Sequence, residues 1–174
     1  MKAARMMTVL ATSLLLASCV PESDSGSQRG AETEASYAER LFEVTSDVLE
    51  QSAWTKEGSW GPCEKPRDHH VQWFFVAQSF SEQSAEPSAL ADRVLKAWQE
   101  YGIQATRSED TILNQQIVSD PTYLSGTNTD GSLRQVSISQ DAVFVQLLSA
   151  CVPGDLDALR VVRPTPSVTP PSSP

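Results

Sequence analysis

The chain has 174 residues, of which 40% are hydrophobic, and its 13 basic and 22 acidic residues give a formal net charge of −9. This length and apolar content favour one packed domain. The acidic balance argues against nucleic-acid binding, because phosphate contacts need clustered Lys and Arg.

Residues 1–18 have the composition of an export signal. Lys2 and Arg5 form a positive region, and the uncharged, mostly apolar stretch from Met6 to Ala17 follows them. That stretch is too short for a permanent transmembrane helix, which needs about 20 residues. Ala17 and Ser18 are the small residues that a signal peptidase requires. An ordinary secretory signal cleaved near Ala17 would export the chain equally well.

Cys19 follows directly, and Leu16-Ala17-Ser18-Cys19 resembles the lipobox of bacterial lipoproteins. The resemblance implies a diacylglyceryl thioether on Cys19, cleavage before it, and usually a third acyl chain on the new amine. Two or three chains anchor a protein stably, since each buried CH₂ contributes about 0.8 kcal/mol. The expected location is the extracytoplasmic face of the cell membrane, reached by general secretion because no twin-arginine pair is present.

Cleavage would make the chain more acidic. Losing Lys2 and Arg5 leaves 11 basic residues of the 13 against 22 acidic ones, which is a net charge of −11. Such a surface avoids anionic headgroups, so the acylated Cys19 is the expected membrane contact. The expected partners are membrane lipid, through Cys19, and an envelope protein or glycan.

Residues 19–35 are predicted to be a flexible tether, because Ser, Gly and acidic residues dominate and no apolar period is present. Ser36-Tyr37-Ala38-Glu39 then fits a capping box. Apolar residues recur at spacings of three and four from Ala38 to Leu49, which predicts an amphipathic helix from about Tyr37 to Ser52.

Residues 54–70 are predicted to be an irregular loop, because Gly and Pro recur in them. A strand at 71–78 follows, apolar on both faces, and then a helix that begins at Pro87 and ends with Gly102 as its left-handed cap. The remaining predicted strands are 103–107, 112–118, 132–139 and 142–149, with a hairpin turn at 140–141.

This order predicts a single α+β domain over residues 36–162. Its expected architecture is two helices packed on one face of a mostly antiparallel sheet of four to five strands. Residues 163–174 are rich in Pro, Ser and Thr and are predicted to be a disordered tail.

Cys63 and Cys151 are the only cysteines besides Cys19. In an oxidising compartment such a pair usually forms a disulfide, and their positions beside the first and last predicted strands allow Cα atoms within ~6 Å. No Cys-x-x-Cys motif supports a redox pair. A metal site using His69 and His70 is disfavoured, because adjacent residues on a strand point to opposite faces. No metal or other cofactor is predicted.

No catalytic motif is present. Nucleophilic catalysis needs a nucleophile, a base and an orienting group, and the chain has no Gly-x-Ser-x-Gly, Ser-x-x-Lys or phosphate-binding loop. Trp73 and Trp98 fall on predicted core positions. Trp54 and Trp60, beside Cys63, either cover an edge of the core or form an aromatic platform that contacts a glycan or peptide ligand.

The lipobox, the tether, Trp60-Gly61-Pro62-Cys63 and Cys151-Val152-Pro153 together resemble small uncharacterised lipoproteins of high-GC Gram-positive bacteria. The resemblance implies the location and the pairing of Cys63 with Cys151, and nothing catalytic. The predicted function is a membrane-anchored, non-enzymatic binding or accessory module. One alternative is a cell-envelope hydrolase or transferase without a visible motif, and another places the function in a wall-associated or glycosylated tail.

Overall fold

The computed structural model describes residues 24–51, 53–63, 69–83 and 85–161. Residues 1–18, Cys19 and the tail at 163–174 therefore lie outside the described residues. The helices are α1 (Asp24–Leu49), α2 (Pro87–Glu100) and α3 (Leu156–Val161). The strands are β1 (Thr55–Pro62), β2 (His70–Ser79), β3 (Thr106–Asp110), β4 (Gln115–Asp120), β5 (Leu133–Ile138), β6 (Val143–Leu148) and β7 (Val152–Pro153).

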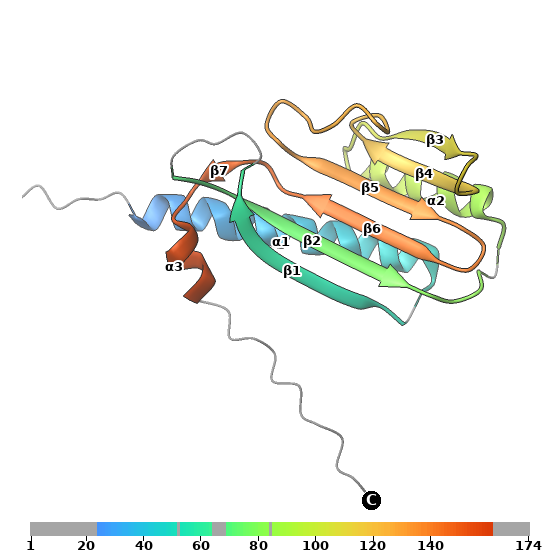
Figure 1. Ribbon diagram of the computed structural model, residues 1–174, viewed down its shortest axis with the longest axis horizontal. Coiled ribbons are helices and arrows are strands. Elements are labelled where there is room, and N and C mark those ends of the chain that lie inside the picture. The colour runs from blue at the N-terminus through green and yellow to red at the C-terminus, as the bar shows by residue number, and fades with distance from the viewer. Residues whose placement is uncertain (1–23, 52, 64–68, 84, 162–174) are drawn as a thin grey trace, which may run out of the picture.

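The strands form one antiparallel sheet in the order β1-β2-β6-β5-β4-β3, and β7 pairs with the start of β2. Helices α1 and α2 lie behind this sheet, on one face, and α3 sits at the end where α1 begins (Figure 1). The predicted α+β class is confirmed. The sheet has seven strands rather than four to five, because β1 and β7 were not predicted.

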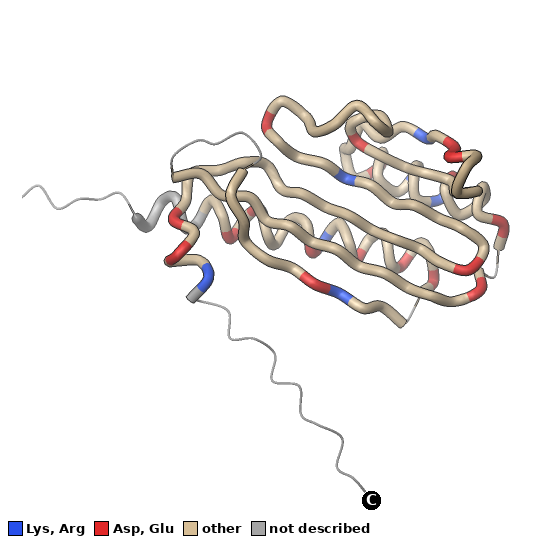
Figure 2. Tube along the Cα trace, in the orientation of Figure 1, with Lys and Arg blue, Asp and Glu red and all other residues tan. Residues whose placement is uncertain are grey.

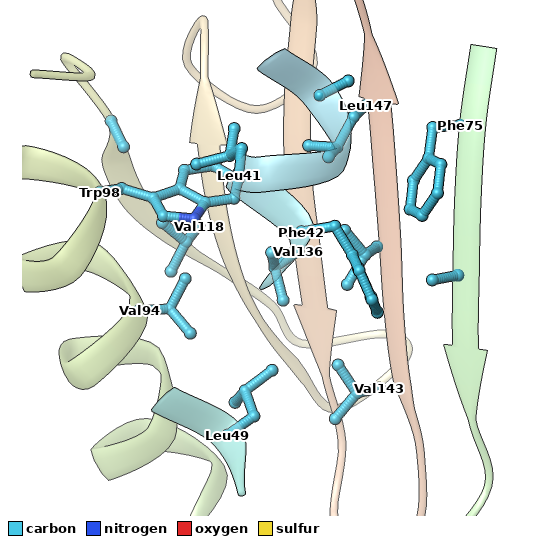
Figure 3. Packing of buried hydrophobic residues seen from close by; sticks show 14 of the residues in the cluster. Leu41, Phe42, Leu49, Phe75, Val94, Trp98, Val118, Val136, Val143 and Leu147 are labelled. Atoms are coloured by element: carbon cyan, nitrogen blue, oxygen red, sulfur yellow. The ribbon is translucent and has the colours of Figure 1, made fainter. Parts of the chain in front are cut away.

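The hydrophobic core lies between the two long helices and the sheet (Figure 3). In β2, Val71, Trp73, Phe75 and Ala77 alternate toward the helices, as the two-residue period of a strand requires. The side chains that meet them include Leu41, Phe42 and Leu49 from α1, Leu90, Val94 and Trp98 from α2, and Val118, Val136, Val143 and Leu147 from the other strands. This packing confirms the core positions predicted for Trp73 and Trp98.

Helix α1 begins at Asp24, so the prediction of a flexible tether is wrong from residue 24 onward. The predicted capping residue Ser36 lies within the helix. The reason is visible at Ala31, which is fully buried and clusters with Val71 of β2 and Leu159 of α3. Small alanines give a weak apolar period, and packing against another element supplies most of the stability of such a helix.

Strand β1 occupies part of the region predicted to be an irregular loop. Its two glycines lie against aromatic rings of β2 and are not part of turns. A Cβ at Gly58 would overlap Cζ2 of Trp73, and a Cβ at Gly61 would lie 2.7 Å from Cε2 of Phe74. Pro62 ends the strand at the sheet edge, where a missing N–H is tolerated.

The other boundaries follow the prediction more closely. β2, α2, β5 and β6 overlap their predicted ranges, and Gly102 has the expected positive φ of 88°. β3 and β4 each begin three residues later than predicted. Among the described residues, no helix is both long and apolar enough to cross a bilayer.

One buried hydrogen bond joins the two long helices. The Thr45 hydroxyl of α1 accepts the indole N–H of Trp98 of α2 at 2.9 Å and donates to the Leu41 carbonyl at 2.8 Å. Thr45→Val should lower the free energy of unfolding by about 1–3 kcal/mol, because it leaves a buried donor without its acceptor. Urea unfolding measures this loss. Thr45→Ser keeps the hydroxyl, and an equal loss in both variants would show that the hydrogen bond is unimportant.

Candidate functional site

Cys63 and Cys151 form a disulfide with their Cα atoms 5.9 Å apart. The bond ties the end of β1 to the segment between β6 and β7. The Cys151 N–H also donates to the Asp130 carbonyl at 2.8 Å, so a third segment is held at the same place. Among the described residues, no group of three or more His, Cys, Asp or Glu side chains could hold a metal ion.

Trp54 and Trp60 lie at opposite ends of β1 and are half-buried. The ring of Trp54 meets Phe42 edge-on with centroids 5.1 Å apart, and that of Trp60 meets Trp73 at the same separation. Six residues of strand span about 20 Å, so the two indoles do not form one continuous platform. Each covers an edge of the core and leaves the middle of β1 between them.

A groove of about 280 Å³ opens between α1 and the middle of β1. Its floor is apolar, because the rings of Phe42 and Phe75 pack there with centroids 5.1 Å apart. Gly58 adds only backbone atoms to the groove, because the place of a Cβ there is taken by the Trp73 ring. The complete lining is Glu39, Phe42 and Glu43 of α1, Lys56, Glu57 and Gly58 of β1, and Phe75 of β2.

The rim of the groove is acidic. Two glutamates of α1, Glu39 and Glu43, line it beside a single lysine, Lys56; the side chain of Glu57 points to the other face of the strand, because neighbouring side chains alternate. The Lys56 Nζ lies 5.1 Å from the centre of the Phe42 ring, within reach of a cation–π interaction. Figure 2 shows acidic residues along α1 and one basic and one acidic residue next to each other on β1, whereas the central strands β2 and β6 carry no charged residue. The groove therefore favours a ligand that combines an apolar group with a positive charge.

A second cluster of polar groups surrounds Arg134 of β5. Its guanidinium pairs with the Asp120 carboxylate at 2.6 Å and lies 5.7 Å from the centre of the Tyr37 ring. Burial raises the pKa of Tyr37, so the phenol keeps its proton at neutral pH. The adjoining cavity holds only about 10 Å³, the space of a single water. The cluster thus has no room for a substrate and acts as a structural ion pair.

Two aspartates with lowered pKa values, Asp110 at the end of β3 and Asp130 in the turn before β5, act as hydrogen-bond acceptors. Asp110 accepts the backbone N–H of Leu113 and the Tyr123 hydroxyl, and the Leu113 bond does most to lower its pKa. Burial alone would raise the pKa of Asp130, but hydrogen bonds from Ser132 and the nearby positive charge of Arg134 act together against it, and the pKa is lowered. Both side chains are therefore ionised at neutral pH and are not proton donors there.

The described chain is thus an α+β domain with a preformed, acidic-rimmed groove beside an edge strand. No protein-family model matches the sequence, and no curated protein is significantly similar to it. One similar solved structure is that of a DUF4853 family protein from Actinomyces odontolyticus. It shares 17% sequence identity, with 78% of this chain and 77% of that chain covered and a TM-score of 0.45.

Proposed function

We propose that this protein is a lipid-anchored, extracytoplasmic binding module that holds an envelope protein in the groove between α1 and β1. The observation that carries the proposal is the groove itself, which is open, has an apolar floor and has a charged rim. Its volume of about 280 Å³ has room for one or two side chains.

The anchoring half of the proposal rests on the lipobox, and the disulfide supports it because such bonds persist in oxidising compartments. The length of α1 limits how far the groove can lie from Cys19. Asp24 lies five residues after Cys19, a stretch that spans at most about 17 Å. Glu39 lies about 22 Å further along the helix axis. The groove is therefore within about 40 Å of the bilayer, and its partner is a membrane-proximal protein.

Replacing the lipidated cysteine tests the anchoring directly. Cys19→Ala should move the protein from the washed membrane fraction to a soluble or unprocessed form and abolish its labelling by a palmitate analogue. Ser18→Ala keeps a small residue before the cysteine and should leave both properties unchanged. Immunoblotting of the fractions measures the result. A Cys19→Ala protein that is processed and remains on washed membranes would show that the folded domain itself binds the membrane.

A further inference from the structure

We propose that the ligand of the groove is an extended peptide that adds to the outer edge of β1 as an extra antiparallel strand, with an apolar side chain in the groove and a Lys or Arg beside its rim. The inference rests on the proposed function and deepens it, because it names the chemistry of the bound segment. In strand addition, main-chain hydrogen bonds supply affinity and alternate side chains supply specificity.

The direction of the β1 backbone groups follows from the neighbouring strand. Both backbone groups of Trp73 point away from β1, since its N–H donates to the Ser149 hydroxyl at 2.9 Å and its carbonyl accepts the Ser149 N–H at 3.0 Å. Trp60 is the direct partner of Trp73 in the antiparallel register. In such a non-hydrogen-bonded pair the groups of both residues turn outward. Trp60, Gly58 and Lys56 therefore present their N–H and C=O groups to the outer edge of the sheet.

That outer edge has no strand partner among the residues that the structure describes. β1 is the terminal strand of the sheet, and its residues from Thr55 to Ser59 are exposed. Unpaired edges of this kind are templates for pairing with another chain. Pro62 lacks an N–H and limits the pairing at one end, so the available stretch runs from Lys56 to Trp60.

The groove lies beside the same stretch of β1. Directly opposed residues in an antiparallel pair place their side chains on the same side of the sheet. The side chain of a ligand residue opposite Gly58 would therefore point toward the helices, as the side chains of Trp73 and Phe75 do. There it enters the groove over Phe42 and Phe75.

Charge decides which peptides fit. The carboxylates of Glu39 and Glu43 outnumber the Lys56 ammonium at the rim, so a Lys or Arg of the peptide that lies beside the apolar residue strengthens binding and an Asp or Glu weakens it. A second copy of this chain is the competing occupant, through pairing of two β1 strands. The acidic rims would then face each other, and like charges across an interface are unfavourable.

The test uses the full-length protein in detergent micelles and fluorescent peptides of about seven residues, long enough to span β1. The parent peptide alternates Thr and Lys around a central Leu. In a second peptide, the Leu amide and every second amide on either side of it are N-methylated; these are the amides that would face β1. In a third peptide, the remaining amides, which would face away from β1, are N-methylated. In fluorescence anisotropy, the parent and third peptides should bind, and the affinity of the second peptide should be at least about tenfold lower. Replacing Lys by Glu in the parent should weaken binding similarly.

Variants of the protein provide the matched half of the test. Lys56→Pro removes one outward N–H without removing a bond to β2, and it should weaken the parent peptide at least about tenfold. Lys56→Ala loses the same ammonium but keeps that N–H, so it should bind the cationic parent peptide at least as tightly as the unmodified protein, and the difference between the two variants isolates the N–H. Glu43→Lys should weaken binding, whereas Glu109→Lys on the opposite edge strand should not. Thermal unfolding checks that Lys56→Pro still folds.

Three results would overturn the inference. Equal binding of the two N-methylated peptides would exclude strand pairing at this edge. A concentration-dependent dimer that Lys56→Pro abolishes would make a second copy the occupant. Failure of every peptide to bind at millimolar concentration would exclude an extended peptide as the ligand. The proposed function would survive these results if a photo-crosslinker in the groove still captured an envelope protein in cells.

Discussion

Replacing Cys63 and Cys151 together by Ser is expected to lower the free energy of unfolding by about 4–5 kcal/mol, and this is the largest effect predicted for the fold. The two cysteines are 88 residues apart in sequence, so their bond closes a loop that contains most of the domain. Without it, the unfolded chain regains the entropy of that loop. The bond also joins β1 to the end of β6, and the edge strand should be the first element to loosen.

Urea unfolding of the variant and of the unmodified protein, each with and without a reductant, measures this effect. The reductant should destabilise the unmodified protein to the level of the variant and leave the variant unchanged. A loss below about 1 kcal/mol would contradict the prediction, because typical native disulfides contribute about 2–5 kcal/mol. Hydrogen exchange at β1 should accelerate more than exchange at α2.

Gly58→Ala is expected to lower the free energy of unfolding by about 3 kcal/mol, at the upper end of typical overpacking costs. The new Cβ would overlap Cζ2 of Trp73. That indole is only 1% exposed and packs within the core, so it has little freedom to move. β1 would shift away from β2 or distort, and the groove beside Gly58 would change with it.

Gly61→Ala is the matched control for that substitution. Its Cβ would lie 2.7 Å from Cε2 of Phe74, but this ring is half-buried on the face of the sheet opposite the helices and can turn aside. The expected cost is below about 1 kcal/mol, as for most substitutions outside the core. Equal losses in Gly58→Ala and Gly61→Ala would show that the rigidity of Trp73 is not the cause.

The sequence predicted those elements whose local residue pattern matches the structure that they adopt in the packed domain. β2 and β6 are rich in β-branched and aromatic residues, and α2 has a Pro at its start and a Gly after its end. The pairing of Cys63 with Cys151 followed from an even number of remaining cysteines in a chain that was predicted to be exported. None of these predictions required knowledge of which elements meet in space.

The candidate site could not be predicted, because it depends on β1. Gly58, Gly61 and Pro62 indicate a loop when only local propensities are considered, and the aromatic rings that require the two glycines come from β2. One available signal was the spacing of Trp54 and Trp60. Residues an even number of positions apart lie on the same face of a strand, and both of these indoles pack against the core.

The start of α1 was missed for a related reason. Ala31 is buried by Val71 and Leu159, which lie far from it in sequence, and small residues give little hydrophobic signal of their own. The consequence bears on function. A helix that begins at Asp24 replaces most of the predicted tether, so under the proposed anchoring at Cys19 the groove stays within about 40 Å of the bilayer.

Photo-crosslinking from the groove in living cells is the most direct test of the central claim, that this anchored domain binds a partner protein between α1 and β1. A photoreactive amino acid replaces Glu43 at the groove rim or, as the control, Glu109 on the opposite edge strand. We expect a discrete protein adduct from position 43 in the membrane fraction, none from position 109, and a weaker adduct from position 43 when Cys19→Ala is also present. No adduct from position 43, or the same adduct from both positions, would contradict the account.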